Sequence, residues 1–428
     1  MRKKSEKKVA EAEKVDAETS YSLGLKHENG DGVPEDPAEA ARLYRLAAGQ
    51  GLGKAQYRLG LLYHEGRGLP MDKPEALKWF ALAADQGDRD AQYKMGLAYF
   101  EGDDVPEDKA EALRWFLLAA EQGEPGAQGI LGFMYSEGEG VPEDTAEALK
   151  WHLLAAEQGE PGSQESLGLI YYEGLGGVEE DKAEALKWFL LAAEQDMGLA
   201  QEYLGTMYYN GEIVAVDKAK AFKWLRLAAE QDMFFAKVQL ADMYFEGDSV
   251  PRDRAEALKW YLGAAEEGMD WAQERVGDIY YEGIGVPRDL SEALKWYLEA
   301  GEQENEHSQY QLGLIYHKGG EDVARDSGEA FKWFLRAARR NHVKAQIKVG
   351  DMYCRGDGPA RDKAEALAWY RLAADQGDRD AQYKLGSMYA KGEGVAKSKA
   401  KAAKWLRLAA GQGLSRAKAA LDKIETKG

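Results

Sequence analysis

The chain has 428 residues, of which 45% are hydrophobic and 31% are charged, a composition typical of folded globular proteins rather than disordered ones. The formal net charge is −19, and the single cysteine, Cys354, excludes an internal disulfide framework and a cysteine-based metal cluster. The sequence contains no apolar run of about 18 residues, so we predict no membrane span.

The first predicted element is a charged N-terminal leader, residues 1–18. It begins with basic residues, MRKK, but lacks the apolar segment that follows them in a secretory signal. We therefore expect a cytoplasmic protein from the sequence as it stands, and a periplasmic or secreted one if a longer leader has been removed.

A repeated segment follows the leader. The stretch AQYRLGLLY, which begins at residue 55, returns in register at residues 91, 127, 163, 200, 236, 272, 308, 345 and 381. The spacing is 36 residues, twice 37, and degenerate copies begin at residues 19 and 417. A second series keeps the same step: Trp79, Trp115, Trp151, Trp188, Trp224, Trp260, Trp296, Trp333, Trp369 and Trp405. Self-similarity at such a period is typical of solenoid proteins.

Each repeat predicts two helices. In the first, helix A, the residues Ala55, Leu59 and Tyr63 lie four apart and share one face. A glycine beside this face, Gly60, recurs in most copies, and since glycine weakens a helix, we expect another helix to pack closely against it. The second, helix B at 74–86, carries alanines and an aromatic pair at helical spacing.

The linker between the two helices, residues 65–72, contains glycines and a proline, which end the first helix. Asp72 and Glu75 then form an Asp-x-x-Glu start signal, which recurs in most copies. We expect the aspartate to accept from a free N–H of the helix start and the glutamate to reach back to the N–H of the cap residue.

The combined pattern, A-x-x-x-L-G-x-x-Y, a glycine-rich linker ending in V-P-x-D, and A-E-A-L-K-W-x-x-x-A-A-x-x-G, resembles the Sel-1-like repeat family over residues 19–421. The resemblance implies a TPR-like scaffold that assembles proteins, as in bacterial signalling adaptors and host-interaction factors. A pair of helices this short cannot bury its apolar face alone, so the repeats must stack. We expect an all-α fold, a right-handed α/α superhelical solenoid of about 11 helix-turn-helix repeats at 19–416, closed by a C-terminal capping helix and tail at 417–428.

No pattern in the sequence predicts catalysis or a bound metal. The histidines have no metal-ligand spacing and are expected on the surface or in a groove, and the repeated carboxylates are explained by helix capping. The GxG linkers follow helices rather than strands, so phosphate binding is not expected. One secreted branch of the Sel-1-like repeat family, which this chain resembles, is linked to β-lactam binding. That branch has paired cysteines, which this chain lacks. We therefore predict no enzyme, no cofactor and no metal site.

Charge is unevenly distributed along the chain. From Arg325 onward there are 23 Lys+Arg and 12 Asp+Glu, so the preceding residues carry a net charge of −30. Such blocks favour partners of opposite charge, here a protein or peptide with basic patches, although the alternative is a merely solubilising surface. An acidic body repels phosphate, so no nucleic acid is expected.

Helix-A positions 3, 7 and 10, counted from the recurring alanine as position 1, vary between copies and share a second face. We predict that this face lines a concave groove that binds a partner, because aromatic residues suit binding hot spots. The candidate partner-binding residues are Tyr57, Tyr93, Phe100, Phe133, Tyr172, Tyr209, Phe245, Tyr281 and Tyr310. In the alternative interpretation, position 10 completes the core between repeats.

A second apolar patch is predicted where the turns between repeats carry hydrophobic residues in place of Gly-Asp or Gly-Glu. Its members are Met233, Phe234, Phe235, Met269 and Trp271. Together they suit docking or self-association, and the alternative is that Phe235 and Trp271 only staple the start of a helix.

Two functions remain open from the sequence. The first is a non-enzymatic protein-interaction scaffold that binds its partner through the concave helix-A face. The second is an exported binder of glycan or peptidoglycan fragments, which stacked aromatic and acidic side chains would also serve.

Overall fold

The computed structural model describes residues 16–102, 105–320 and 323–426. Within these ranges the chain is all-α, with twenty-three α-helices, one short 3-10 helix and no strand, so the predicted fold class is confirmed. Residues 1–15 of the predicted leader lie outside the described residues, and the first described helix begins at Ala17. None of the described helices combines the length and hydropathy that a membrane span requires.

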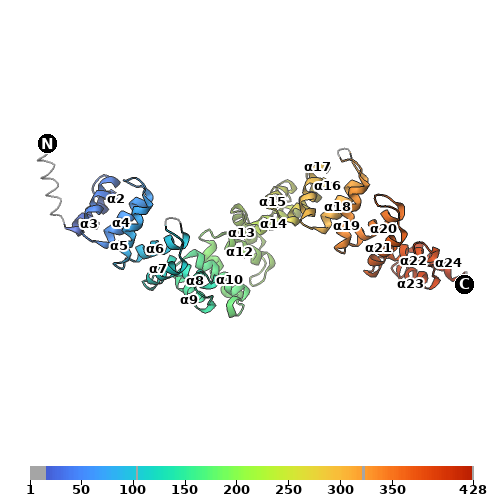
Figure 1. The fold of residues 1–428 in the computed structure, drawn as a ribbon, viewed down its shortest axis with the longest axis horizontal. Helices are drawn as coiled ribbons and strands as arrows, with labels where there is room; N and C mark the ends of the chain where they lie inside the picture. Colours follow the sequence, from blue (N-terminus) through green and yellow to red (C-terminus); the bar gives the residue numbers. More distant parts are fainter. Residues whose placement is uncertain (1–15, 103–104, 321–322, 427–428) are drawn as a thin grey trace. The chain divides into compact units, whose positions relative to one another are not determined.

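The chain divides into two compact units, each described by itself and labelled as in Figure 1. Unit 1, residues 1–207 and 212–215, contains α2 (Ala17–Asn29), α3 (Pro37–Gly49), α4 (Gly53–Glu65), α5 (Lys73–Ala84), α6 (Arg89–Glu101), α7 (Lys109–Glu121), α8 (Pro125–Glu137), α9 (Thr145–Glu157), α10 (Pro161–Glu173), the 3-10 helix η1 (Leu175–Gly177), α11 (Lys182–Ala193) and most of α12 (Gly198–Asn210). Unit 2, residues 208–211 and 216–428, contains α13 (Lys218–Glu230), α14 (Phe234–Glu246), α15 (Arg254–Glu266), α16 (Asp270–Glu282), α17 (Leu290–Glu302), α18 (Glu306–Lys318), α19 (Ser327–Arg339), α20 (Val343–Arg355), α21 (Lys363–Asp375), α22 (Arg379–Lys391), α23 (Lys399–Gly411) and α24 (Ser415–Glu425).

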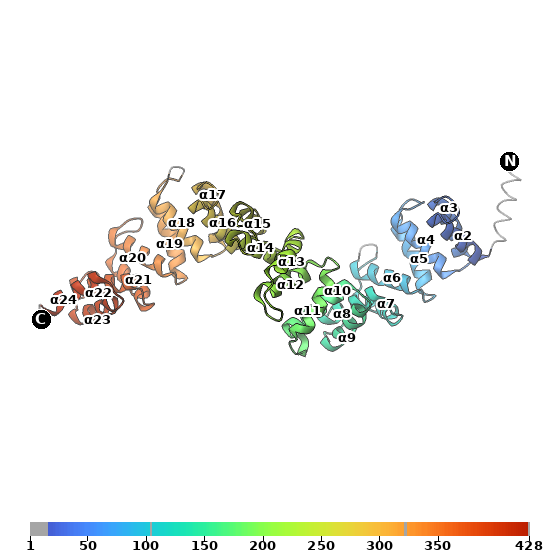
Figure 2. The ribbon, with the colours of Figure 1, turned by 180° about the vertical axis from the view of Figure 1, so that it is seen from behind.

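Helices A and B alternate along the chain, giving eleven pairs followed by α24. From α2 to α11 in unit 1, and from α13 to α24 in unit 2, every helix packs on the next one in sequence, as both views show (Figures 1 and 2). The two helices of one repeat share the more extensive contact, and helix B of each repeat also contacts helix A of the next. The predicted helix-turn-helix repeats are therefore confirmed.

The predicted aspartate caps form, but the predicted return bond from the glutamate does not. Asp72 Oδ1 accepts from the Glu75 N–H at 3.0 Å, as expected. The N–H of Asp72, however, donates to the carbonyl of Tyr63 at 2.9 Å, so it is already satisfied by the end of helix A. The carboxylate of Glu75 therefore turns to Lys78, 2.8 Å away. The linker is closed by backbone bonds rather than by a capping box.

The residue after each helix-B tryptophan forms the centre of the repeat core. In unit 1, Phe116 is fully buried against Gly96 on helix A of the same repeat. A Cβ atom added at Gly96 would come within 2.6 Å of the Phe116 ring, closer than real Cβ contacts allow. The expected close approach at the helix-A glycine is confirmed, and the group that approaches is an aromatic ring of the repeat's own helix B.

A ladder of glutamine side chains joins successive repeats. Gln56 at helix-A position 2 is buried, and its Nε2 donates to the carbonyl of Ala48 in the preceding repeat at 3.3 Å. Its Oε1 accepts from Gln86 at the end of its own helix B at 2.6 Å. The buried amide of Gln56 is thereby satisfied from two repeats, which suits a polar group that has been removed from water.

One repeat of unit 2 replaces this glutamine pair with ions. Lys237, 6% exposed, takes position 2 of α14, and its ammonium contacts Glu267, which takes the place of the second glutamine. Asp232 lies 2.9 Å from the same ammonium. A buried cation destabilises the fold unless it is paired with an anion. The replacement of the first glutamine by Lys237 therefore requires the replacement of the second by Glu267.

Glu267→Gln alone should destabilise unit 2 by about 2 kcal/mol, because the Lys237 ammonium loses its closest counter-ion while it stays buried. Adding Lys237→Gln should recover most of that loss by restoring the glutamine pair of the other repeats. Urea denaturation of both single variants and the double variant measures the coupling. Strictly additive effects would contradict this interpretation.

Candidate binding cleft on the helix-A face

The helix-A face is the surface formed by positions 3, 7 and 10 of the first helix of each repeat. Most of its aromatic residues rest on the buried helix-B ring of their own repeat. The ring centroids of Tyr93 and Phe100 lie 6.1 Å and 6.0 Å from that of Phe116, and in unit 2 the Tyr310 ring lies 5.6 Å from that of Phe334. Every candidate residue is partly buried except Phe133, whose side chain is 45% exposed. These rings therefore have one side on the core and one side toward solvent.

Cations cover the outer side of several position-10 rings. The first residue of helix B supplies the cation in most of these contacts, and Arg288 in the linker before α17 supplies one. The distance to the ring centroid is 3.5 Å for Lys109 over Phe100 and 4.8 Å for Lys182 over Tyr172. In unit 2 the distances are 4.8 Å for Lys218 over Tyr209, 5.5 Å for Arg254 over Phe245 and 5.4 Å for Arg288 over Tyr281. Cation–π contacts of this kind occupy a ring face that a ligand would otherwise use.

Three of the candidate residues meet at one cleft in unit 1. Tyr93, Phe100 and Phe133 line a cavity of about 350 Å³ that spans α6, α8 and α10. The rings of Phe100 and Phe133 meet edge to face, with centroids 6.5 Å apart. The remaining candidates, Tyr57 among them, do not line this cavity.

Two glycines on α8 leave room for this cleft. Position 3 of this helix is Gly129, where the two preceding repeats carry Tyr57 and Tyr93. A Cβ atom at Gly129 would lie 3.1 Å from Ser163 Oγ, and one at Gly126 would lie 2.9 Å from the Tyr93 hydroxyl, so both glycines let the α6 and α10 side chains approach.

The floor of the cleft is a buried histidine. His152, 4% exposed, takes the helix-B core position that Phe116 holds one repeat earlier, and its Nδ1 lies 3.3 Å from Ser163 Oγ. Burial lowers the pKa of His152 to about 4, because charging the imidazole there would cost desolvation. His152 thus lies at a groove, as expected for the histidines, but its side chain is buried in the core, a position that its place directly after Trp151 could have revealed.

Two carboxylates stand at the α10 side of the cleft. Glu160 caps α10 by accepting from the N–H groups of Gly162 at 3.0 Å and Ser163 at 2.5 Å. Glu165 accepts from the Ala200 N–H at 3.0 Å, and burial raises the pKa of its carboxyl group. The cleft thus combines aromatic walls with hydrogen-bonding groups at one end.

The second predicted patch lies in unit 2. Phe234 and Phe235 open α14, with ring centroids 4.0 Å apart, and Phe235 is 51% exposed. Met269 and Trp271 are partly buried against the core formed by α14 to α16. Phe235 is thus the exposed member of the row, and its use as a docking surface stays a prediction.

The Sel1 repeat model matches eleven consecutive segments, which together cover most of the chain: residues 17–52, 53–88, 89–124, 125–160, 161–197, 198–233, 235–269, 272–305, 306–342, 343–378 and 379–414. The chain belongs to the Sel1 repeat family. The predicted family and the number of repeats are therefore confirmed. Sel1 repeat proteins are generally protein-interaction scaffolds and are typically non-enzymatic.

Two solved structures agree with this assignment. A protective antigen present in uropathogenic Escherichia coli strains, which displays an SLR fold, is 38% identical, with a TM-score of 0.80, over 90% of this chain and 82% of that one. A Sel1 repeat protein from Oxalobacter formigenes is 34% identical, with a TM-score of 0.52, over 73% of this chain and 90% of that one. No curated protein matches the chain.

Three Sel1 repeats of unit 2 carry a polar version of the core. The residue after tryptophan is a tyrosine, and its hydroxyl donates to an aspartate at position 7 of the same repeat's helix A. The pairs are Tyr261 with Asp242, Tyr297 with Asp278 at 2.6 Å, and Tyr370 with Asp351 at 2.5 Å. Burial and the nearby carboxylate raise the pKa of each tyrosine, which keeps the phenol protonated as a donor.

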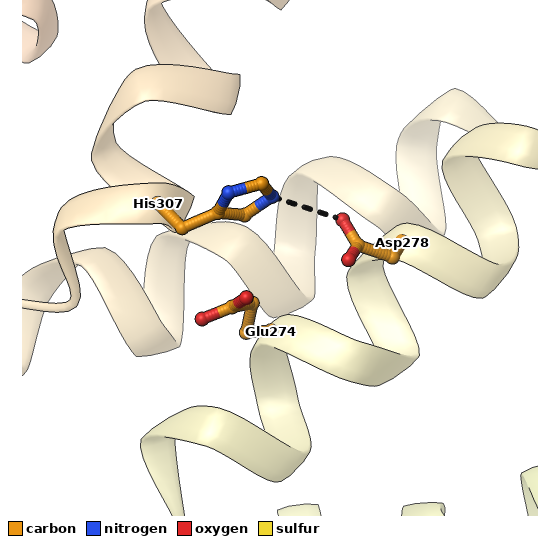
Figure 3. A group of neighbouring side chains, drawn as sticks. All are labelled: Glu274, Asp278 and His307. Carbon is orange, nitrogen blue, oxygen red and sulfur yellow. Dashed lines mark hydrogen bonds and ion pairs between the residues drawn. The ribbon is translucent and has the colours of Figure 1, made fainter. Parts of the chain in front are cut away.

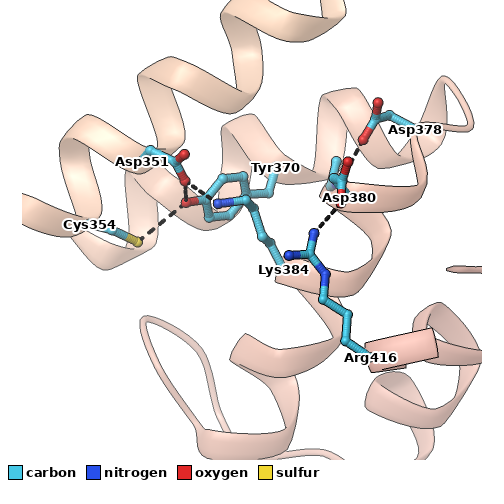
Figure 4. Close-up of polar contacts among 8 residues, drawn as sticks. Asp351, Cys354, Tyr370, Asp378, Asp380, Lys384 and Arg416 are labelled. Atoms are coloured by element: carbon cyan, nitrogen blue, oxygen red, sulfur yellow. Dashed lines mark hydrogen bonds and ion pairs between the residues drawn. The ribbon is translucent and has the colours of Figure 1, made fainter. Parts of the chain in front are cut away.

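Helix A of the following repeat completes each network. Beside Asp278, the His307 Nε2 of α18 lies 3.3 Å from Oδ1 (Figure 3). Beside Asp351, the Lys384 ammonium of α22 lies 2.5 Å from Oδ1, and Cys354 Sγ lies 3.8 Å from the Tyr370 hydroxyl (Figure 4). The sequence carried a signal for these networks, since tyrosine after tryptophan occurs together with aspartate at position 7, but the stacking of helices was needed to find the third partner.

Proposed function

We propose that this Sel1 repeat protein is a non-enzymatic scaffold that binds a short segment of a partner protein in the cleft across α6, α8 and α10. The observation that carries the proposal is Phe133, which is 45% exposed beside a cavity that Gly129 leaves open. An exposed aromatic residue in a concave site is the usual arrangement of a binding hot spot. Membership of a family of interaction scaffolds supports protein binding in general.

The chemistry of the cleft favours a segment with an apolar and a basic residue. An aromatic or aliphatic side chain would pack on the exposed ring of Phe133, while Glu160 at the other end would attract a lysine or arginine. The net charge of −30 before Arg325 adds long-range attraction for a basic partner.

Phe133→Ala should weaken binding of such a segment at least tenfold, because it removes the exposed wall of the cleft. The probe is a set of dodecapeptides enriched from a random phage library on the wild-type chain, with affinities measured by fluorescence polarisation. We expect enriched peptides that place Lys or Arg near an aromatic residue. Gly129→Tyr, which supplies the side chain found at position 3 of the two preceding repeats, should weaken binding similarly.

Leu154→Ala is the matched control for this experiment. Leu154 is 39% exposed and lies in the same repeat as Phe133, but on helix B. Its removal should leave the affinities unchanged. Enriched peptides that bind all three variants as well as wild type would overturn the proposed cleft. Saturable binding of soluble muropeptides that depends on Phe133, with no enriched peptide, would favour the glycan-binding alternative instead.

A further inference from the structure

The three tyrosine–aspartate networks of unit 2 differ in the charge that faces the aspartate. Helix-A position 4 of the next repeat holds Arg275, which lies over the ring of Tyr261 and interacts electrostatically with Asp242, and Lys384 beside Asp351. The residue at that position beside Asp278 is Gln311, which is neutral. The cation that accompanies the aspartate in two repeats is therefore replaced by an amide in the third.

The same repeat gains a second carboxylate and an imidazole. Position 3 of helix A is Val238 or Ile347 where the cation is present, but Glu274 in the repeat of Asp278. His307 comes from the start of α18 and faces both carboxylates, as Figure 3 shows. One oxygen of each carboxylate and one nitrogen of His307 all lie within 4.8 Å of one another.

The distance between His307 and Asp278 fits a first coordination shell. Bonds of about 2.0–2.2 Å in tetrahedral geometry place neighbouring ligand atoms about 3.4 Å apart. His307 Nε2 and Asp278 Oδ1 are 3.3 Å apart without any rearrangement. Glu274 and Asp278 are four residues apart on one helix and so lie on the same face.

Neighbouring side chains hold the carboxylates in place. The Tyr297 hydroxyl donates to Asp278 at 2.6 Å, and Asn305 Nδ2 donates to Glu274 at 2.8 Å. Gln311 Nε2 lies 3.1 Å from His307 Nε2. If His307 bound a metal ion through Nε2, the ion would replace this contact with the amide. Hydrogen bonds to the ligands from a surrounding shell orient metal sites and raise their affinity.

We propose that Glu274, Asp278 and His307 form a binding site for a divalent transition-metal ion, with Zn²⁺ as the best match. One imidazole nitrogen with two carboxylate oxygens suits Zn²⁺, whereas Ca²⁺ and Mg²⁺ prefer oxygen ligands alone. The ion would bridge α16 and α18 and supply the positive charge that Arg275 and Lys384 supply in the related repeats. The sequence predicted no metal site, because His307 is 29 residues from Asp278 and only the stacking of repeats joins them.

Isothermal titration of the full, metal-stripped chain with Zn²⁺ tests the site. We expect one Zn²⁺ per chain whose binding falls at least tenfold in His307→Ala and in Glu274→Gln, and Co²⁺ should give visible absorption bands that both variants lose. Circular dichroism and thermal unfolding without metal show that the variants are folded. His64→Ala, which removes an exposed histidine of unit 1, is the control and should bind Zn²⁺ as wild type does.

Two results would overturn the site. The first is no saturable Zn²⁺ binding at 100-fold molar excess over the chain. The second is Zn²⁺ binding that is equal in wild type, His307→Ala and Glu274→Gln, which would mean adventitious binding elsewhere. Thermal unfolding gives an independent readout, since Zn²⁺ should raise the Tm of wild type but not that of His307→Ala.

Discussion

Phe116→Ala should destabilise unit 1 by about 4 kcal/mol, since truncating a buried phenylalanine typically costs about 3–5 kcal/mol. Phe116 is fully buried and its ring lies directly on Gly96, so no side chain on that side can move in to fill the cavity. The ring also supports Tyr93 and Phe100. Urea denaturation followed by circular dichroism measures the loss.

The effect should be local as well as large. In a repeat protein each repeat contacts only its neighbours, so weakening one repeat in the middle can separate the unfolding of the segments on either side. We therefore expect a broadened transition in the variant. Leu118→Ala on the same helix is the control, because Leu118 is 39% exposed, and it should change stability by no more than about 0.5 kcal/mol. Equal losses in both variants would contradict the proposed core.

His152→Phe should make unit 1 less sensitive to acid. The folded chain holds the pKa of His152 at about 4, below the ordinary value of 6.5. Above pH 6.5 the imidazole is neutral in both the folded and the unfolded state. As the pH falls from 6.5 to 4, the unfolded chain binds a proton that the folded chain does not, and wild type loses stability. The phenylalanine variant lacks this loss, so its advantage over wild type should grow by about 2 kcal/mol between pH 7 and pH 5.

The comparison between two pH values isolates this effect from the change in packing. Phenylalanine occupies the same position in two adjacent repeats of unit 1, as Phe116 and Phe189, so the ring fits the core. Any constant difference in stability cancels when pH 7 and pH 5 are compared. His64→Phe, a change at an exposed histidine, should show the same difference from wild type at both values. A pH-independent gap for His152→Phe would refute the buried neutral imidazole.

The repeat itself could be read from the sequence in detail. Its 36-residue step, the Ala-Leu-Tyr face of helix A, the aspartate caps and the turn residues all follow from helix geometry, which depends on neighbours within a few residues. The recurring glycine even predicted a close helix contact, although not that an aromatic ring makes it. The expected bond from Glu75 to the cap N–H does not form, because the cap N–H of Asp72 donates to the carbonyl of Tyr63 on the other side of the linker. A contact across the linker cannot be predicted from helix geometry alone.

The candidate sites depend on contacts between repeats, which could not be predicted from the sequence. Its pattern placed Phe133 on the helix-A face, but the cleft exists because Gly129 is empty where the preceding repeat carries a tyrosine. His307 and Asp278 share no periodic signal, yet they meet because α18 stacks beside α16. Local helix geometry repeats at a constant interval and can therefore be predicted from the sequence. The approach of side chains from different repeats is determined by how the helices stack, and only the tertiary structure decides that.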